Sequence, residues 1–167
     1  MKNLYIDFDG VIMNTIEITY EDMVKKNINQ ANQAEVRNYY KNIDWQELLR
    51  KSHEINDGIQ CIKSLIESDK YEVSILTHIN SLHEAVEKIK YIRKYFKDIT
   101  IIPVPRELSK TDMVHVEGSI LVDDYAGNLE EWREKGGIAI RFSKKLHGKG
   151  FTVIDKLDQL FDIEECN

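Results

Sequence analysis

Short apolar runs alternate with longer stretches of mixed polarity along most of the chain. Five runs are typical of buried strands and a sixth of an edge strand: residues 4–8, 72–76, 99–104, 119–122, 138–142 and 153–154. Between the runs, apolar residues recur at helical spacing and predict helices over residues 56–66, 81–96, 109–114, 129–135 and 157–161. Strands that are apolar on both faces and alternate with helices form parallel sheets. The pattern therefore predicts a three-layer, doubly wound α/β domain.

Residues 16–54 break this alternation, because they contain helical patterns but no convincing strand, glycine or proline. Within them, Asp44 is a suitable N-cap for a helix, and Glu47 three residues later would complete a capping box. We expect a small helical cap here, inserted after the first strand into a core domain formed by residues 1–15 and 55–167. Four aromatic side chains of the cap either pack its helices together or stack on a flat substrate group: Tyr20, Tyr39, Tyr40 and Trp45.

The chain has 167 residues, of which 23 are basic and 29 acidic, so that its net charge is −6. This balance argues against extended nucleic acid or a membrane surface as partners, but it allows a local basic pocket for a small phosphorylated ligand. No apolar run approaches the roughly 20 residues of a membrane span, and the first strand begins too early for a signal peptide. We therefore expect a cytoplasmic protein. Cys61 fits a helix core and Cys166 lies on the tail, so neither indicates a disulfide or a metal site.

Two acidic residues stand at the end of the first predicted strand, in residues 7–11 (DFDGV). Residues two apart on an extended chain point to the same side, and the end of a parallel strand faces the crevice where such sheets bind ligands. A divalent cation commonly offsets the repulsion between two carboxylates this close together. The same residue types also occur in turns and calcium loops, but a helix-loop-helix calcium site would need glutamate where the chain has Ile18.

Further polar residues lie near the ends of other predicted strands. Thr77 follows the second strand, and Asp123 and Asp124 follow the fourth. Lys110 begins a short helix before the fourth strand. The carboxyl ends of parallel strands lie along one edge of a sheet, so we expect these side chains to meet the two aspartates of the first motif there.

This set of groups suits phosphoryl transfer. Asp7 can attack phosphorus as a nucleophile and form an acyl phosphate, while Asp9 can protonate the leaving oxygen and later deprotonate water. Thr77 and Lys110 can bind the phosphoryl oxygens through hydrogen bonds and a positive charge. Asp123 completes an oxygen-ligand site for Mg²⁺, which would also neutralise the charge of Asp7.

In order and position, four segments resemble the four motifs of the haloacid dehalogenase-like (HAD) hydrolase superfamily: residues 7–11, Thr77, Lys110 and residues 121–124 (LVDD). The resemblance covers nearly the whole chain outside the cap. It implies a Rossmann-like core, Asp7 as the nucleophile, and phosphatase rather than dehalogenase chemistry, because a second aspartate stands two residues later. It also implies that Mg²⁺ is held by Asp7, the backbone carbonyl of Asp9, and Asp123. Asp124 would then be a water-mediated or direct partner of the ion.

Within the superfamily, the Asp-Gly-Val start, the cap directly after it and the compact length resemble the 5′(3′)-deoxyribonucleotidases. Those enzymes commonly have serine after the threonine of the second motif, whereas this chain has His78, and its cap is short. His78 is the only histidine near the predicted pocket, and we include it among the residues that bind the substrate phosphate.

Two assignments stay open on the sequence alone. The phosphate-binding charge assigned to Lys110 could come from one of four other basic residues: Arg106, Lys144, Lys145 or Lys149. Asp124 could be the N-cap of the following turn rather than a metal ligand.

The sequence therefore predicts a Mg²⁺-dependent phosphatase that hydrolyses a small phosphomonoester through an aspartyl-phosphate on Asp7. A nucleoside monophosphate, in particular a deoxyribonucleoside monophosphate, is the first expected substrate, because of the narrower resemblance and the aromatic residues of the cap. Two alternatives remain: a phosphatase of sugar or other small-metabolite phosphates, and a non-catalytic phosphate- or nucleotide-binding module. A homodimer is also left open, because several apolar surfaces could mediate one.

Overall fold

A six-stranded parallel sheet forms the centre of the molecule, and the computed structural model describes all of residues 1–167. The strand order is β3-β2-β1-β4-β5-β6, and every neighbouring pair is parallel. The strands are β1 (Lys2–Ile6), β2 (Tyr71–Ile79), β3 (Thr100–Pro105), β4 (Ile120–Asp123), β5 (Ile138–Phe142) and β6 (Thr152–Ile154). This topology confirms the predicted doubly wound α/β fold. The winding reverses between β1 and β4, and sheets of this kind bind ligands beyond the strand ends at such a point.

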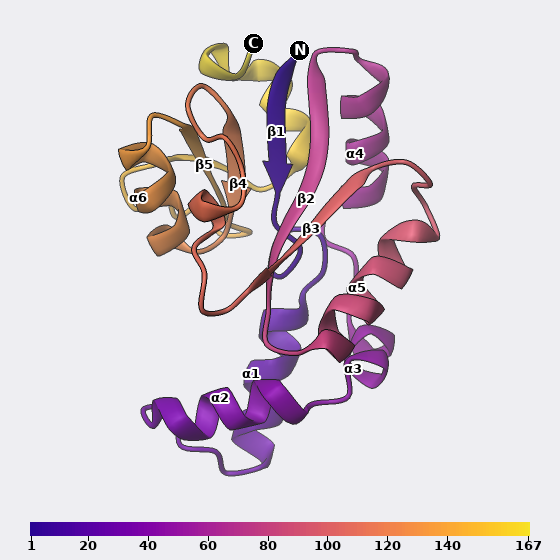
Figure 1. Ribbon diagram of the computed structural model, residues 1–167, viewed down its shortest axis with the longest axis vertical. Helices are drawn as coiled ribbons and strands as arrows, with labels where there is room; N and C mark the ends of the chain where they lie inside the picture. Colours follow the sequence, from indigo (N-terminus) through magenta and orange to yellow (C-terminus); the bar gives the residue numbers. More distant parts are fainter.

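Helices cover both faces of the sheet, as Figure 1 shows, and each face has its own apolar core. Along β1, Leu4 and Ile6 belong to the larger core, whereas Tyr5 belongs to the smaller one and contacts Trp132. The apolar run at residues 4–6 of β1 thus reflects burial on both faces. The covering elements are α4 (Gly58–Glu67), α5 (Leu82–Arg93), α6 (Ala126–Glu134) and the 3₁₀ turns η1 (Lys110–Asp112), η2 (Leu157–Asp162) and η3 (Glu164–Cys166).

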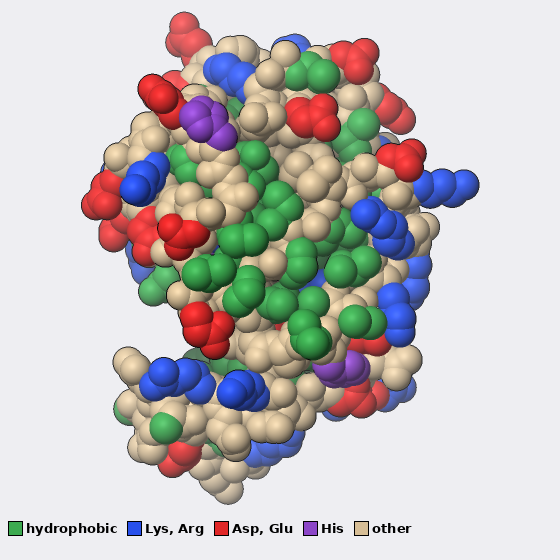
Figure 2. Space-filling model, viewed as in Figure 1, with side chains coloured by type: hydrophobic (Ala, Val, Ile, Leu, Met, Phe, Trp, Pro, Cys, Tyr) green, Lys and Arg blue, Asp and Glu red, His purple; other side chains and the backbone are tan.

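Three more helices lie between β1 and α4 in the sequence: α1 (Thr15–Lys25), α2 (Gln33–Asn42) and α3 (Trp45–Lys51). Figure 1 shows them at the end of the molecule to which the β1 arrow points, and Figure 2 shows a notch between this part and the rest. The Trp45 backbone N–H donates a hydrogen bond to His83 Nε2 at 3.1 Å, which ties α3 to α5. The division into a core and a cap at residues 16–54 stays a prediction. None of the helices has the length and apolar character needed to cross a membrane.

Local hydrogen bonds confirm one predicted helix start and shift another. Asp44 caps α3 as predicted, because its side chain accepts hydrogen bonds from two backbone N–H groups of the first turn. The predicted capping box is wrong, since the Glu47 side chain binds Arg50 instead. The helix predicted from residue 56 begins later, because the N-cap of α4 is Asp57. Asp57 and Asn56 both adopt left-handed backbone angles, with φ of 55° and 44°.

The buried face of α5 differs in part from the predicted one. Of the apolar residues at helical spacing in residues 81–96, Ile92 is buried as that spacing predicts, but Leu82 and Val86 are 82% and 46% exposed. Glu84 and Lys88 are buried in their place, each with 1% exposure. Charged residues take the inward face because they meet partners of opposite charge beneath the helix. Cys166, which the sequence analysis placed on the tail, is also buried, within η3.

Candidate active site

The turn after β1 brings Asp7 and Asp9 to the carboxyl edge of the sheet. The carbonyl of Phe8 accepts hydrogen bonds from the backbone N–H groups of the residues three, four and five positions later, which makes the turn compact. Gly10 has a φ of +75°, and a Cβ at this position would lie 2.3 Å from Asp124 Oδ2. Glycine is therefore needed here both for the backbone angle and for the close approach of Asp124.

Lys110 is buried between two carboxylates. Its Nζ lies 2.9 Å from Asp7 Oδ1 and 2.6 Å from Asp123 Oδ2. Burial alone would lower the pKa of Lys110, but the charges of Asp123 and Asp7 outweigh this effect and raise its pKa. The lysine is therefore a fixed positive charge at the point where β1 and β4 end.

Three carboxylates come close enough to share a cation. One oxygen each of Asp7, Asp123 and Asp124 lies within 4.8 Å of the other two. Burial raises the pKa of Asp7 to about 7, opposed by Lys110 and reinforced by Asp123 and Asp9. Burial also raises the pKa of Asp124 well above its usual value. Without a cation these groups are costly to ionise together, and their hard oxygen donors fit Mg²⁺.

Asp123 and Asp124 differ in how their oxygens are used. Both oxygens of Asp123 accept hydrogen bonds within the protein, from Lys110, from the Asn128 amide at 2.9 Å and from the Tyr125 backbone N–H at 2.8 Å. Asp124 accepts no hydrogen bond from the protein. Of the two, Asp124 therefore has its oxygens free for a cation, while Asp123 orients Lys110.

The Asp9 side chain has a separate set of partners. Its Oδ1 accepts a hydrogen bond from Thr15 Oγ1 at 2.6 Å, and its Oδ2 accepts one from Lys88 Nζ at 2.5 Å. Lys88 Nζ also lies 3.0 Å from Glu84 Oε1 on the same helix. The metal contact predicted for Asp9 uses its backbone carbonyl, so the carboxylate remains available for proton transfer.

Thr77 and His78 lie beside these groups, within β2 rather than after it, because the strand continues to Ile79. Thr77 is buried, and its Oγ1 accepts a hydrogen bond from Lys88 at 3.0 Å. His78 Nε2 lies 2.8 Å from the Leu108 carbonyl oxygen, which can only accept, so Nε2 carries the hydrogen. Burial lowers the pKa of His78. The neutral ring then offers Nδ1 as an acceptor, which suits a hydroxyl group of a ligand better than a phosphate oxygen.

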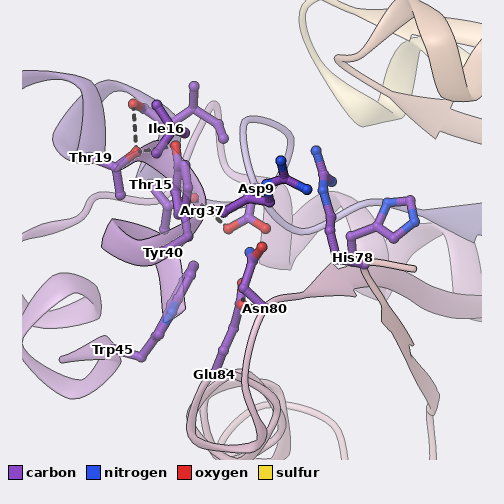
Figure 3. Close-up of a pocket in the computed structure, with 12 residues that line it drawn as sticks. Asp9, Thr15, Ile16, Thr19, Arg37, Tyr40, Trp45, His78, Asn80 and Glu84 are labelled. Atoms are coloured by element: carbon purple, nitrogen blue, oxygen red, sulfur yellow. Dashed lines mark hydrogen bonds between the residues drawn. The ribbon is translucent and has the colours of Figure 1, made fainter. Parts of the chain in front are cut away.

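Two adjoining hollows open at this edge. The first, of about 230 Å³, is bordered by Lys110 and the three clustered carboxylates. The second, of about 190 Å³, lies between the sheet edge and α1–α3, and Tyr40, Trp45 and Arg37 border it (Figure 3). Asp9 borders both hollows and stands between them. The other residues shared by the two hollows are Ile16, His78 and Arg106.

The structure distinguishes Lys110 from the other basic residues that the sequence leaves as candidates for phosphate binding. Lys110 alone contacts Asp7 and Asp123. Arg106 is at the rim of the same hollow, whereas Lys144 and Lys145 border a different one.

Sequence reasoning missed three residues of this site: Glu84, Lys88 and Asn128. Glu84 and Lys88 are spaced by four residues, a pattern that usually marks an ion pair on the solvated surface of a helix. Asn128 follows Asp123 by five residues and is held in place by α6. The only sequence signal was the Glu84–Lys88 spacing, and it does not distinguish a buried pair from an exposed one.

Comparisons with solved structures find the same fold over nearly the whole chain. A hydrolase from Pseudomonas syringae is 11% identical, with a TM-score of 0.61 and 97% of each chain covered. A HAD hydrolase of family IA, variant 3, from Entamoeba histolytica HM-1:IMSS is 12% identical, with a TM-score of 0.55 and coverage of 100% of this chain and 91% of that chain. A HAD-superfamily hydrolase from Ehrlichia chaffeensis is 14% identical, with a TM-score of 0.56 and coverage of 97% and 96%. No protein-family model and no curated protein sequence matches the chain. The chain therefore has the fold of HAD hydrolases.

Proposed function

We propose that this chain is a Mg²⁺-dependent phosphomonoesterase in which Asp7 is the nucleophile. The observation that carries the proposal is the meeting of Asp7, Lys110 and the pair Asp123–Asp124 at the reversal point of the sheet. These residues come from separate parts of the sequence, and the fold brings them together beside a hollow large enough for a phosphoryl group. The fold shared with HAD hydrolases supports this assignment.

In the proposed mechanism, a residue of the site carries out each step of hydrolysis. Lys110 holds Asp7 Oδ1, which leaves the second oxygen of Asp7 for attack on phosphorus. The attack breaks the ester P–O bond and forms an aspartyl-phosphate, while Asp9 donates a proton to the leaving oxygen. Asp9 then accepts a proton from the water that hydrolyses the aspartyl-phosphate, which releases phosphate and restores Asp7. Thr77 and Lys110 bind the phosphoryl oxygens throughout.

The metal ligands would be carboxylate oxygens of Asp7 and Asp124 and the backbone carbonyl of Asp9. Asp123 completes the acidic set, and its hydrogen bond to Lys110 keeps the lysine directed at the phosphate. A Mg²⁺ ion bound here would neutralise the carboxylates and so allow an anionic substrate to approach Asp7.

The hollow on the side of α1–α3 would hold the leaving group, and these helices would act as a cap that excludes bulk water. The Tyr40 ring and the Asn80 amide border it, as a nucleoside leaving group would require, so a nucleoside monophosphate is the first proposed substrate. A second class of substrate is also proposed. It is favoured by Arg37 and Arg106, which border the same hollow and pair with no carboxylate of the chain. Two unpaired guanidinium groups suit a leaving group that carries its own negative charge.

Hydrolysis of p-nitrophenyl phosphate with Mg²⁺, and with EDTA in its place, tests the reaction. Asp7→Asn should lower kcat by about 1,000-fold or more, because asparagine cannot form the intermediate. Asp98→Asn is the matched control, since Asp98 is exposed and makes no ion pair. Full activity of the Asp7→Asn variant would contradict the covalent mechanism. A wild-type protein that turns over no phosphomonoester with Mg²⁺ would contradict the proposal and favour a binding module.

The substrate is tested by kcat/KM over three groups of compounds. These are nucleoside monophosphates, neutral sugar monophosphates, and monophosphates that carry a second anionic group. A nucleotide preference supports the first class, whereas a preference for the third group that is lost in Arg37→Gln and Arg106→Gln supports the second.

A further inference from the structure

Lys88 is a buried cation beside the proposed active site, and the mechanism above does not use it. We propose that Lys88 is a positioning residue that fixes the Asp9 carboxylate and the Thr77 hydroxyl beneath Trp45 of α3. This proposal rests on the proposed phosphatase function and adds to it a part played by α5.

The Lys88 ammonium is surrounded by acceptors from three elements. Nζ lies 2.5 Å from Asp9 Oδ2 in the turn after β1, and 3.0 Å from Thr77 Oγ1 and from the His78 carbonyl oxygen in β2. The fourth acceptor is Glu84 Oε1 on α5 itself, at 3.0 Å. The lysine thus joins the turn that follows β1 to the end of β2, the two segments that would flank the transferred phosphoryl group.

Two aromatic rings enclose the same ammonium. It lies 4.7 Å from the ring centroid of Trp45 and 5.4 Å from that of Phe8. Trp45 is 2% exposed and belongs to α3, so one of the helices above the leaving-group hollow also shields Lys88 from water. Figure 3 shows Asp9 near the centre of the hollow, with Trp45 at the lower left and Glu84 at the bottom of the view. Aromatic contact of this kind stabilises a desolvated cation.

The hydrogen bonds of Lys88 have a directional consequence for Thr77. A lysine ammonium can only donate, so Thr77 Oγ1 must act as the acceptor in their contact. The hydroxyl hydrogen of Thr77 is then free to point elsewhere, and its one protein acceptor, the His78 carbonyl, is distant at 3.4 Å. Lys88 therefore leaves the Thr77 hydroxyl able to donate to a phosphoryl oxygen.

Asp9 is held on both sides. Thr15 binds Oδ1 and Lys88 binds Oδ2, so rotation of the carboxylate would break at least one short hydrogen bond. Each oxygen keeps another lone pair for proton transfer. A buried ion pair such as Glu84–Lys88 contributes little stability compared with apolar residues of similar volume. The stability of the fold therefore gives little reason for a lysine at position 88. The need to hold the Asp9 carboxylate in place gives a better one.

Steady-state kinetics of Lys88→Met test the proposal, with Lys90→Met as the control. Lys90 lies on the same helix, but its side chain is 64% exposed. The substrates are ethyl phosphate, whose leaving group must be protonated, and p-nitrophenyl phosphate, whose leaving group departs without a proton. For ethyl phosphate we expect kcat to fall by about 100-fold with KM within about threefold, because misplacement by about 1 Å has such an effect. The loss on p-nitrophenyl phosphate should be about tenfold smaller, since only the Thr77 contribution remains.

A second variant guards against loss of folding. Lys88→Met leaves Glu84 buried without its partner, so Lys88→Met/Glu84→Gln removes both charges together. The same difference between the two substrates in this double variant supports the proposal. Equal losses on both substrates, or normal kinetics with a lower melting temperature, would overturn it. If the wild-type protein turns over neither substrate, the phosphatase function itself fails, and that result differs from normal kinetics in the Lys88 variants.

Discussion

Replacing Gly10 with alanine tests whether Asp124 belongs to the metal site. The added Cβ would lie 2.3 Å from Asp124 Oδ2 and 2.8 Å from its Cγ. Ordinary contacts with a Cβ begin at 3.4 Å, so the carboxylate must withdraw by about 1.1 Å (3.4 minus 2.3 Å). The Asp124 carboxylate shares a cluster with Asp7 and Asp123, and a shift of this size would spoil the oxygen set.

The alanine is expected to change two quantities, the free energy of folding and the affinity for Mg²⁺. The backbone effect arises because φ is +75°, a region that costs an alanine about 1–2 kcal/mol of folding free energy. The ligand effect arises from the displaced carboxylate, for which we expect a loss of about 10- to 100-fold in Mg²⁺ affinity. A similar loss in kcat should follow, because a shift of about 1 Å misplaces the reacting groups.

Gly118→Ala is the matched control. Gly118 has a φ of +70°, and a Cβ there would meet nothing within 4 Å. Urea unfolding in EDTA should show similar losses of stability for both variants. The Mg²⁺ concentration that gives half-maximal turnover of p-nitrophenyl phosphate should rise only for Gly10→Ala. If both variants show the wild-type Mg²⁺ dependence, Asp124 has no part in binding the ion.

Three further results are expected. Lys110→Met should lower the free energy of unfolding by about 3–5 kcal/mol, measured by urea titration in EDTA, because it leaves buried carboxylates without their partner; unchanged stability would contradict the buried ion pairs. Trp132→Ala should cost about 3–5 kcal/mol, since its ring is 0% exposed and its Nε1 donates to the Ser119 carbonyl; a loss below about 1 kcal/mol would contradict this packing. At pH 8 a thiol reagent should label neither cysteine of the native protein and both in urea, because both are buried and burial raises the pKa of Cys166 to about 11; rapid native labelling of Cys166 would place the C-terminal segment elsewhere.

The sequence pattern was most informative where burial is continuous. The run at residues 138–142 is β5 with the same bounds, and the short run at 153–154 lies within the edge strand β6. Strands buried on both faces carry apolar side chains at nearly every position, as β5 does apart from Arg141, so they can be recognised without knowledge of their neighbours. Their ends then locate Asp7, Asp9, Thr77 and the pair Asp123–Asp124, because parallel strands share one carboxyl edge.

What the tertiary structure alone decided is which polar residues turn inward. The sequence predicts an inward apolar face for α5, yet the helix buries Glu84 and Lys88 and exposes Leu82. A charged side chain is buried only where groups of opposite charge or hydrogen-bond partners surround it. For Lys88 one such partner is Asp9, which is 79 residues away in the sequence. Tertiary contacts also decide which of Asp123 and Asp124 keeps its oxygens free for a metal ion. Lys110 and Asn128 both bind Oδ2 of Asp123, and the Tyr125 backbone N–H binds its Oδ1. Local patterns thus determine the strands and the residues at their ends, whereas long-range charge pairing determines the orientation of the groups around them.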